Sequence, residues 1–209
     1  MRLLIVALVT AFALPAAAAT KPPIAGVADA LFLGSAKAPV VIEEYASLSC
    51  SHCAEFNAEV FPAFKAKYID TGKVRYVLRE FITPPTEVAV AAWMTARCAG
   101  KDQYFTFVDS FFRRQPEMFK TGDAKAALVA AGRDGGLDEP KVVACLNDQS
   151  QADAVQRRVD AAVARGVEST PTFFINGAPL PPVEPNLAAF DTAIAKALAA
   201  KPVRTKHRR

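Results

Sequence analysis

The chain has 209 residues, of which 52% are hydrophobic and 22% are charged. This is an ordinary globular composition, and it excludes a disordered chain or a repeat protein. The formal net charge of +4 comes from Arg2 and from five bases in residues 201–209, so the segment between them is slightly acidic and no nucleic-acid partner is expected.

Residues 1–19 have the pattern of a secretory signal peptide. A charged start at Arg2 precedes an apolar run over 3–14, and small residues follow at the expected cleavage site near Ala18 or Ala19. An uncleaved membrane anchor is the alternative, but it needs about 20 apolar residues. We therefore expect a soluble, exported protein, in whose oxidising compartment the cysteines are paired.

The residues after this leader predict a strand, a helix and a second strand. Val40–Tyr45 begins as an apolar run, and Lys73–Phe81 alternates between apolar and polar side chains. Between them, an apolar stripe at helical spacing runs from Phe56 to Tyr68, and Pro62 inside it predicts a kink. This order indicates a parallel βαβ unit with a right-handed crossover.

A long helical region is predicted after the prolines at positions 84 and 85. An aromatic stripe over 104–112 favours packing between helices over a ligand site. The predicted helices cover Glu87–Arg97, Tyr104–Phe112, Asp123–Ala131, Asp138–Asn147 and Gln151–Arg165.

Strand character returns at Thr172–Ile175, and Asn176-Gly177 is the strongest hairpin signal in the chain. The partner strand over 178–183 contains prolines, so it fits only the edge of a sheet. An amphipathic helix over 186–200 follows.

A βαβ half and a ββα half thus flank an all-helical insert, which is the arrangement of an α/β, thioredoxin-like fold with a helical insertion. We expect the first part of this fold in residues 20–83, the insertion in 84–165 and the second part in 166–200. The basic tail, 201–209, is expected to be disordered.

The four cysteines allow three connectivities, and their spacing favours one of them. Cys50 and Cys53 form a C-x-x-C motif, which leaves Cys98 and Cys145 as the second pair. A structural zinc site needs four ligands, usually from two short-spaced pairs, and the sequence has no second such pair. No metal and no organic cofactor is expected.

The C-x-x-C motif stands where the predicted helix begins. Free N-H groups and the positive end of the helix dipole favour a thiolate at Cys50, whereas Cys53 should be more buried. Cys50 would react with substrate and Cys53 would resolve the mixed disulfide. His52, between them, would lower the pKa of the Cys50 thiol further, which makes the disulfide a stronger oxidant. A static short-loop disulfide is the alternative.

Thr170-Pro171, immediately before the strand at 172–175, is where a thioredoxin-like fold carries a cis proline that faces the C-x-x-C. Proline tolerates the cis bond at low cost, and the neighbouring backbone groups can pair with an extended peptide. An ordinary proline at the start of a strand is the alternative.

These segments together resemble the DsbA-like thiol:disulfide oxidoreductases of the bacterial periplasm. The resemblance rests on residues 43–53, 72–76 and 170–177 and covers nearly all of the expected mature chain. It implies that Cys50 is the reactive cysteine, Cys53 its partner and Pro171 the cis proline. Glu44 matches a family carboxylate, and a buried glutamate there would relay protons to Cys53. A solvated strand residue is the alternative for Glu44.

The sequence departs from this family at two positions. Ser51-His52 stands where the family most often has Pro-His. The histidine that stabilises the thiolate is kept, so we expect an oxidising protein, but one that is less strongly oxidising than the extreme members of the family. A threonine before the cis proline, as at Thr170, also resembles the sequence of the periplasmic disulfide isomerases. The preferred substrate therefore stays open. A subset of the family has a second disulfide like Cys98–Cys145, which would be a structural staple or a regulatory pair.

The resemblance implies donation of disulfides to exported, unfolded proteins, with reoxidation by a DsbB-like, quinone-linked membrane partner. A periplasmic isomerase or reductase is the alternative enzyme. Known isomerases of this type carry an N-terminal dimerisation domain, for which the expected mature chain has no room, so we expect a monomer. A holdase that binds peptides in the cis-proline groove is an alternative without catalysis.

Overall fold

The computed structural model describes residues 30–181 and 186–200. The expectations for the signal peptide, for the basic tail and for residues 182 and 183 of the edge strand fall outside these residues. Within the two described ranges, no helix combines the length and the hydropathy that crossing a bilayer requires.

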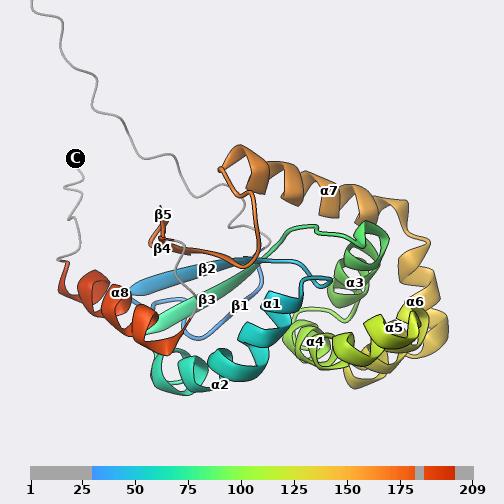
Figure 1. The fold of residues 1–209 in the computed structure, drawn as a ribbon, viewed down its shortest axis with the longest axis horizontal. Coiled ribbons are helices and arrows are strands. Elements are labelled where there is room, and N and C mark those ends of the chain that lie inside the picture. Colours follow the sequence, from blue (N-terminus) through green and yellow to red (C-terminus); the bar gives the residue numbers. More distant parts are fainter. Residues whose placement is uncertain (1–29, 182–185, 201–209) are drawn as a thin grey trace, which may run out of the picture.

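A five-stranded mixed sheet lies at the centre of the molecule, in the order β1-β3-β2-β4-β5 (Figure 1). β2 and β3 are parallel, as the βαβ pattern predicts, and all other neighbours are antiparallel. The central strand, β2, is almost entirely buried, because helices cover both faces of the sheet. The strands are β1 (Phe32–Leu33), β2 (Val40–Ala46), β3 (Val74–Glu80), β4 (Thr172–Ile175) and β5 (Ala178–Pro179).

The helix between β2 and β3 changes its winding along its length. It consists of α1 (Ser51–Glu55), the π-helical segment η1 (Phe56–Val60), α2 (Phe61–Phe64) and a second π-helical segment, η2 (Lys65–Ile69). Pro62 has no N-H to donate to the preceding turn, and the wider winding before it accommodates this loss. The sequence predicts a kink at Pro62, and the structure shows a change of winding there.

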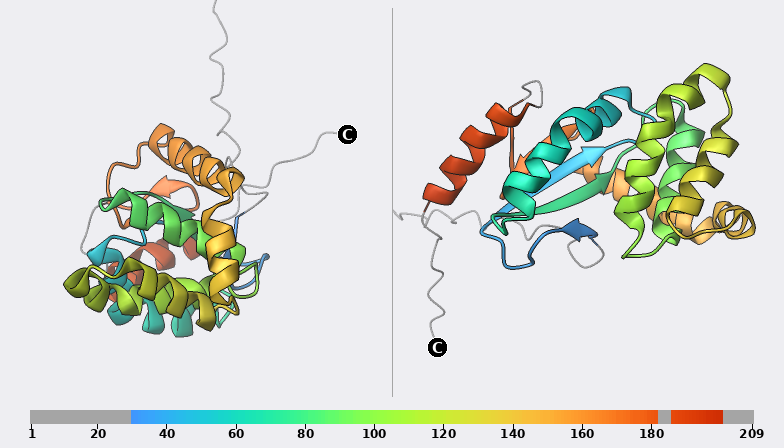
Figure 2. Two further views of the ribbon diagram at one scale, coloured as in Figure 1. Left: turned by 90° about the vertical axis from the view of Figure 1, so that its right-hand side faces the viewer. Right: turned by 90° about the horizontal axis from the view of Figure 1, so that it is seen from below.

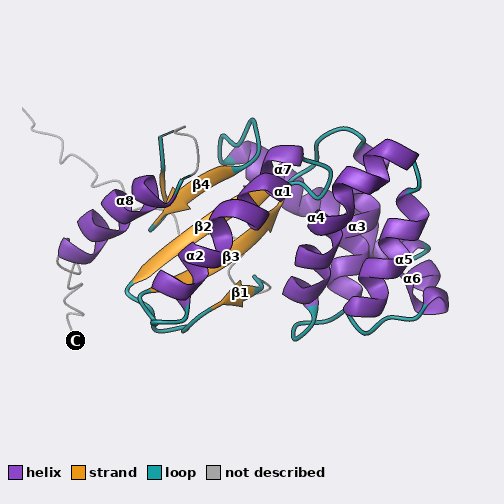
Figure 3. Ribbon diagram, turned by 60° about the horizontal axis from the view of Figure 1, so that its bottom comes forward, coloured by secondary structure: helices purple, strands orange, loops and turns teal. Residues whose placement is uncertain are grey.

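One face of the sheet is covered by this helix and by α8 (Leu187–Ala199), as Figure 3 shows. Four aromatic rings join the two helices to β4. Phe56 and Phe64 on the first helix, Phe173 on β4 and Phe190 on α8 have neighbouring ring centroids between 5.0 and 5.8 Å apart. This packing fixes the first helix on the sheet and therefore fixes where α1 begins.

The helical insertion lies between β3 and β4 in sequence and extends from one end of the sheet (Figure 2). Its aromatic stripe packs in the core, as predicted, since Phe107 and Phe111 are fully buried. α4 continues past the predicted end at residue 112, because Gly122, with a φ of 75°, is the residue that ends it. The helices are α3 (Thr86–Cys98), α4 (Tyr104–Thr121), α5 (Ala124–Asp134), α6 (Glu139–Leu146) and α7 (Gln149–Ala164).

The last two strands form the predicted hairpin. Asn176 and Gly177, at the turn, have φ values of 49° and 80°, which are the left-handed conformations that a two-residue hairpin loop requires. β5 is short, contains Pro179 and lies at the edge of the sheet, as the sequence predicts.

Ion pairs with two buried carboxylates tie the insertion to the sheet. Glu80 on β3 accepts hydrogen bonds from Arg97 on α3 and from Arg158 on α7. Glu43 on β2 accepts a hydrogen bond of 2.5 Å from Arg165, the residue that ends α7. Each of these two carboxylates is buried and paired with partly buried arginines, which offsets the cost of its desolvation. The end of α7, five residues before Thr170, is held in this way.

A disulfide joins Cys98 at the end of α3 to Cys145 on α6, across 47 positions. We expect Cys98→Ser/Cys145→Ser to lower the free energy of unfolding by about 4 kcal/mol, because the unfolded chain regains the entropy of the opened loop. Urea unfolding of the double variant and of the wild type, both with the Cys50–Cys53 pair reduced, would measure this difference. Equal unfolding midpoints would contradict the stapling role.

Candidate active site

The C-x-x-C motif lies where the loop after β2 becomes α1. Cys50 is the N-cap residue, with extended backbone at φ −88° and ψ 121°, and Cys53 lies in the first turn. The N-H of Cys50 donates to the carbonyl of Ser47 at 3.0 Å, and the carbonyl of Cys50 accepts from the N-H of Ala54 at 3.2 Å. The sulfur of Cys50 is therefore at the N-terminus of the helix, where backbone N-H groups are free to donate.

The half-buried sulfur of Cys50 is surrounded by donors that stabilise a thiolate. A hydrogen bond from the Cys53 thiol lowers the pKa of Cys50 most, and the backbone N-H groups of Cys53 and His52 lower it further. Burial opposes them, and the resulting pKa of Cys50 is about 5. In the reduced protein, Cys50 is thus a thiolate at neutral pH.

Cys53 has the opposite environment. Its side chain is fully buried, and burial raises the pKa of its thiol well above the ordinary value. The neighbouring Cys50 and Glu44 raise this pKa further. Both cysteines are free thiols in this structure. The pair therefore consists of an accessible thiolate and a buried thiol that holds its proton.

Glu44 on β2 lies beneath the pair and is 1% exposed, so it is not a solvated strand residue. Burial is the main cause that raises the pKa of this carboxyl to about 8. The hydroxyl of Tyr76 on β3 donates a hydrogen bond to the carboxylate, which lowers the pKa, and the charge of Cys50 raises it. Glu44 is consequently neutral at neutral pH and can give up a proton.

The Thr170–Pro171 peptide bond is cis and lies just before β4. β4 pairs with β2, with Thr172 opposite Tyr45, so this loop faces the start of α1. The carbonyl oxygen of Thr170 lies 3.5 Å from the sulfur of Cys50, where it can accept a hydrogen bond from the protonated thiol but not from the thiolate. The structure thus brings together the two motifs that lie about 120 positions apart in the sequence.

The two residues between the cysteines, Ser51 and His52, are exposed on the first turn of α1. Nδ1 of His52 lies 3.5 Å from a carboxylate oxygen of Glu55, and both side chains are more than half exposed. The backbone N-H of His52 is among the groups that stabilise the Cys50 thiolate.

The loop before Cys50 is held by residues of the insertion and of the segment that leads into it. The side-chain amide of Gln115 on α4 donates to the carbonyl of Leu48 at 2.5 Å. The hydroxyl of Ser49 donates to the carbonyl of Thr83 at 2.7 Å, and the hydroxyl of Ser47 accepts from the Thr83 N-H at 3.1 Å. These bonds fix the direction in which the chain enters α1.

Sequence reasoning did not single out Tyr76 or Gln115. Tyr76 lies opposite Ile42 in the parallel ladder, two positions before the level of Glu44, so a correct register would have placed it near the carboxyl. Gln115 follows the aromatic stripe of α4, and no local signal marks a polar side chain that is 2% exposed.

The described parts of the chain contain no group of three His, Cys, Asp or Glu side chains that could hold a metal ion. The chemistry of the site therefore has to be derived from two thiols of unequal pKa, a neutral carboxyl and the backbone around the cis proline. These groups suit thiol–disulfide exchange, in which one sulfur is attacked and the other leaves or resolves.

Comparisons with known proteins agree with this arrangement. The sequence profile of a family described as thioredoxin matches residues 27–195. A Rickettsia typhi protein whose name describes a protein-disulfide oxidoreductase is 33% identical over 149 residues, which are 70% of this chain and 54% of that protein. The chain thus spans about half the length of the curated relatives that it matches first.

Solved structures are similar over most of the chain. A variant of alpha-DsbA1 from Wolbachia pipientis is 28% identical, with a TM-score of 0.72, over 82% of this chain and 92% of that one. Oxidised BdbD from Bacillus subtilis has a TM-score of 0.69 over 81% of this chain and 92% of that one, at 21% identity, and it shows a similar fold.

The pKa of Cys50 can be measured from the rate of its alkylation by iodoacetamide. We expect a midpoint at about pH 5 in the reduced wild type. Cys53→Ala should move the midpoint upward, toward the ordinary thiol value of about 8.5, because it removes the strongest hydrogen bond to the thiolate. Cys53→Ser is the control, since its hydroxyl still donates and should shift the midpoint less. An unchanged midpoint in Cys53→Ala would contradict this account of the low pKa.

Proposed function

The chain belongs to the thioredoxin family and, within it, to the DsbA-like thiol:disulfide oxidoreductases, and we propose that it donates disulfides to exported, unfolded proteins through Cys50 and Cys53. The observation that carries this proposal is the unequal stabilisation of the two sulfurs. A pKa of about 5 for Cys50 favours the reduced pair over its disulfide. A pair that is stabilised in its reduced form gives up its disulfide readily.

The transfer proceeds through two exchanges. A substrate thiolate attacks the sulfur of Cys50, the Cys50–Cys53 bond breaks, and Cys53 leaves with the bonding electrons. A second substrate thiolate then attacks the substrate sulfur of the mixed disulfide, and Cys50 leaves as its stable thiolate. The substrate gains a disulfide and loses two electrons, which the cysteine pair takes up. The backbone beside the cis Pro171 would hold the extended substrate near Cys50.

Glu44 supplies a proton to Cys53 in the first exchange. The leaving thiolate of Cys53 is buried and has a raised pKa, so it needs a proton at once. Glu44, which is neutral at neutral pH, becomes a carboxylate as Cys53 becomes a thiol. The hydrogen bond from Tyr76 supports this step, because it stabilises the carboxylate that forms.

The same proposal places the protein in the periplasm, as a monomer that a DsbB-like, quinone-linked membrane protein reoxidises. The signal-peptide pattern of residues 1–19 supports export. Cys50 is only half-buried, so its sulfur is accessible for exchange with a partner protein. Cys98–Cys145 serves as a structural staple, because it joins two helices of the insertion.

Transfer to an unfolded protein tests the proposed direction. We expect the oxidised protein to place a disulfide in a reduced, unfolded test protein within one turnover, and Cys50→Ser to place none. Cys98→Ser/Cys145→Ser is the matched control and should retain the activity. Mass spectrometry after alkylation would count the disulfides formed. A protein that only reduces or only reshuffles existing disulfides would be a reductase or an isomerase instead.

Glu44→Gln tests the proton donor, since glutamine keeps the shape of the side chain without its proton. We expect reduction of the oxidised variant by a small thiol to be about tenfold slower or more at neutral pH. Burial, the main cause that raises the pKa of this carboxyl, acts in the oxidised protein as well, whereas the charge of Cys50 is absent there. The pKa is therefore raised, but less than in the reduced protein, and the advantage of the wild type should be full at acidic pH and fade as the pH rises through this raised pKa. Stopped-flow rates across this range would measure it. The same rate in both proteins would contradict a donor role.

A further inference from the structure

The chain reaches Cys50 through a tight turn. The N-H of Cys50 donates to the carbonyl of Ser47 at 3.0 Å, which closes a β-turn over residues 47–50. The central peptide unit of this turn joins Leu48 to Ser49. Cys50 is also the N-cap residue of α1. The conformation of the turn therefore determines where the Cys50 sulfur lies relative to the free N-H groups at the start of the helix.

The central peptide unit of the turn is held at both ends. Its carbonyl, on Leu48, accepts a hydrogen bond of 2.5 Å from the side-chain amide of Gln115. Its N-H, on Ser49, donates to the hydroxyl of Ser47 at 3.4 Å. A central peptide unit without such bonds can rotate, which converts one type of β-turn into another and changes the dihedral angles of the two central residues. With both ends bonded, the turn keeps one conformation.

Gln115 stands at a position of α4 where packing alone would favour an apolar side chain. Phe107 and Phe111 precede it at intervals of four, so the three side chains share one face of the helix, and both rings are fully buried. Gln115 itself is 2% exposed. An amide is costly to bury unless it forms hydrogen bonds, and a carbonyl oxygen can only accept one. The bond to Leu48 therefore explains a polar side chain on this face.

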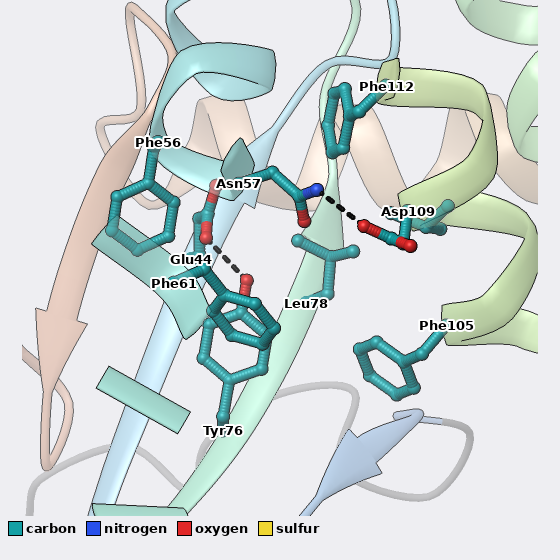
Figure 4. A pocket seen from close by; sticks show the side chains of 10 residues that line it. Glu44, Phe56, Asn57, Phe61, Tyr76, Leu78, Phe105, Asp109 and Phe112 are labelled. Atoms are coloured by element: carbon teal, nitrogen blue, oxygen red, sulfur yellow. Dashed lines mark hydrogen bonds between the residues drawn. The ribbon is translucent and has the colours of Figure 1, made fainter. Parts of the chain in front are cut away.

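The helix α4 contacts the chain on both sides of the cysteine pair. Gln115 meets the turn before the pair, and Asp109 accepts a hydrogen bond of 3.0 Å from the side-chain amide of Asn57, on η1 after the pair (Figure 4). The side chain of Asp109 is 45% exposed, so water competes for this second contact. Leu48 is fully buried, and a buried carbonyl that loses its donor is left unsatisfied. The contact through Gln115 is thus the firmer of the two.

We propose that Gln115 is a positioning residue for the reactive cysteine. By holding the carbonyl of Leu48, it keeps the turn in the conformation that places the Cys50 sulfur at the free N-H groups of α1. The reduced protein depends on this placement, because hydrogen bonds stabilise its thiolate. In the oxidised protein, the covalent bond to Cys53 holds the sulfur instead. The inference rests on Cys50 as the reacting cysteine, as in the proposed function, but not on the direction in which disulfides are transferred.

Gln115→Met removes the donor and keeps the length of the side chain. We expect the midpoint of Cys50 alkylation by iodoacetamide to rise by about half a pH unit to one pH unit, because the bond that orders the turn is lost. The equilibrium of the Cys50–Cys53 pair with glutathione should shift about three- to tenfold toward the disulfide, since only the reduced form loses stabilisation. A side chain that only packs in the core would change neither reading. Gln115→Leu, with the same expected result, is the second variant if Gln115→Met does not fold.

Two further variants separate positioning from stability and from the docking of α4. Val142→Ala removes buried apolar volume from α6, so it should lower the unfolding midpoint without changing either reading. Asn57→Ala removes the exposed contact of α4 and should change both readings less than Gln115→Met does. Thermal unfolding of each variant would show that it is folded before the readings are compared.

The outcomes distinguish this role from the proposed function. A wild-type midpoint near pH 5 that Gln115→Met leaves unchanged would overturn the positioning role and leave the thiolate of the proposed function intact. Equal changes in Gln115→Met and in Val142→Ala or Asn57→Ala would also overturn it, because stability or docking would then explain the effect. A wild-type midpoint near the ordinary thiol pKa of about 8.5 would remove the basis of both proposals.

Discussion

Two adjacent glutamates on the central strand set the chemistry of this protein, because both are buried and only one is paired with arginines. Side chains alternate along a strand, so Glu43 points toward α7 and Glu44 toward α1. Glu43 meets Arg165 and Arg79 and anchors the end of α7. Glu44 meets the hydroxyl of Tyr76, and burial keeps it neutral at neutral pH. On one face of β2, Glu43 anchors α7 through Arg165, and on the other face, Glu44 keeps a proton at neutral pH.

The reactive sulfur depends on where the first helix begins, and several parts of the fold determine that point. The aromatic cluster with α8 holds the helix on the sheet, and Gln115 of the insertion holds the carbonyl of Leu48. The loop after α7, anchored through Arg165, brings the carbonyl of Thr170 to the sulfur of Cys50. The insertion therefore positions both the loop before Cys50, through Gln115, and the loop that carries Thr170, through Arg165.

The parts of the site that local sequence determines could be predicted, and the parts that depend on strand register could not. The helix start at Cys50 and the strand after Pro171 follow from spacing and proline chemistry. Tyr76 reaches Glu44 only through the parallel ladder, and Gln115 reaches Leu48 across 67 positions. Pro62 signalled an irregularity in this helix but not its π-helical form, because the apolar spacing of the helix is compatible with either winding.

The central claim is that the fold stabilises the Cys50 thiolate and so makes the disulfide oxidising. Equilibration of the Cys50–Cys53 pair with graded glutathione buffers, followed by alkylation and mass analysis, tests this claim most directly. The account predicts a reduction potential of about −120 to −180 mV, in the range of oxidants and oxidising isomerases. A potential near about −270 mV, where thioredoxin lies, would contradict it and would make the protein a reductant.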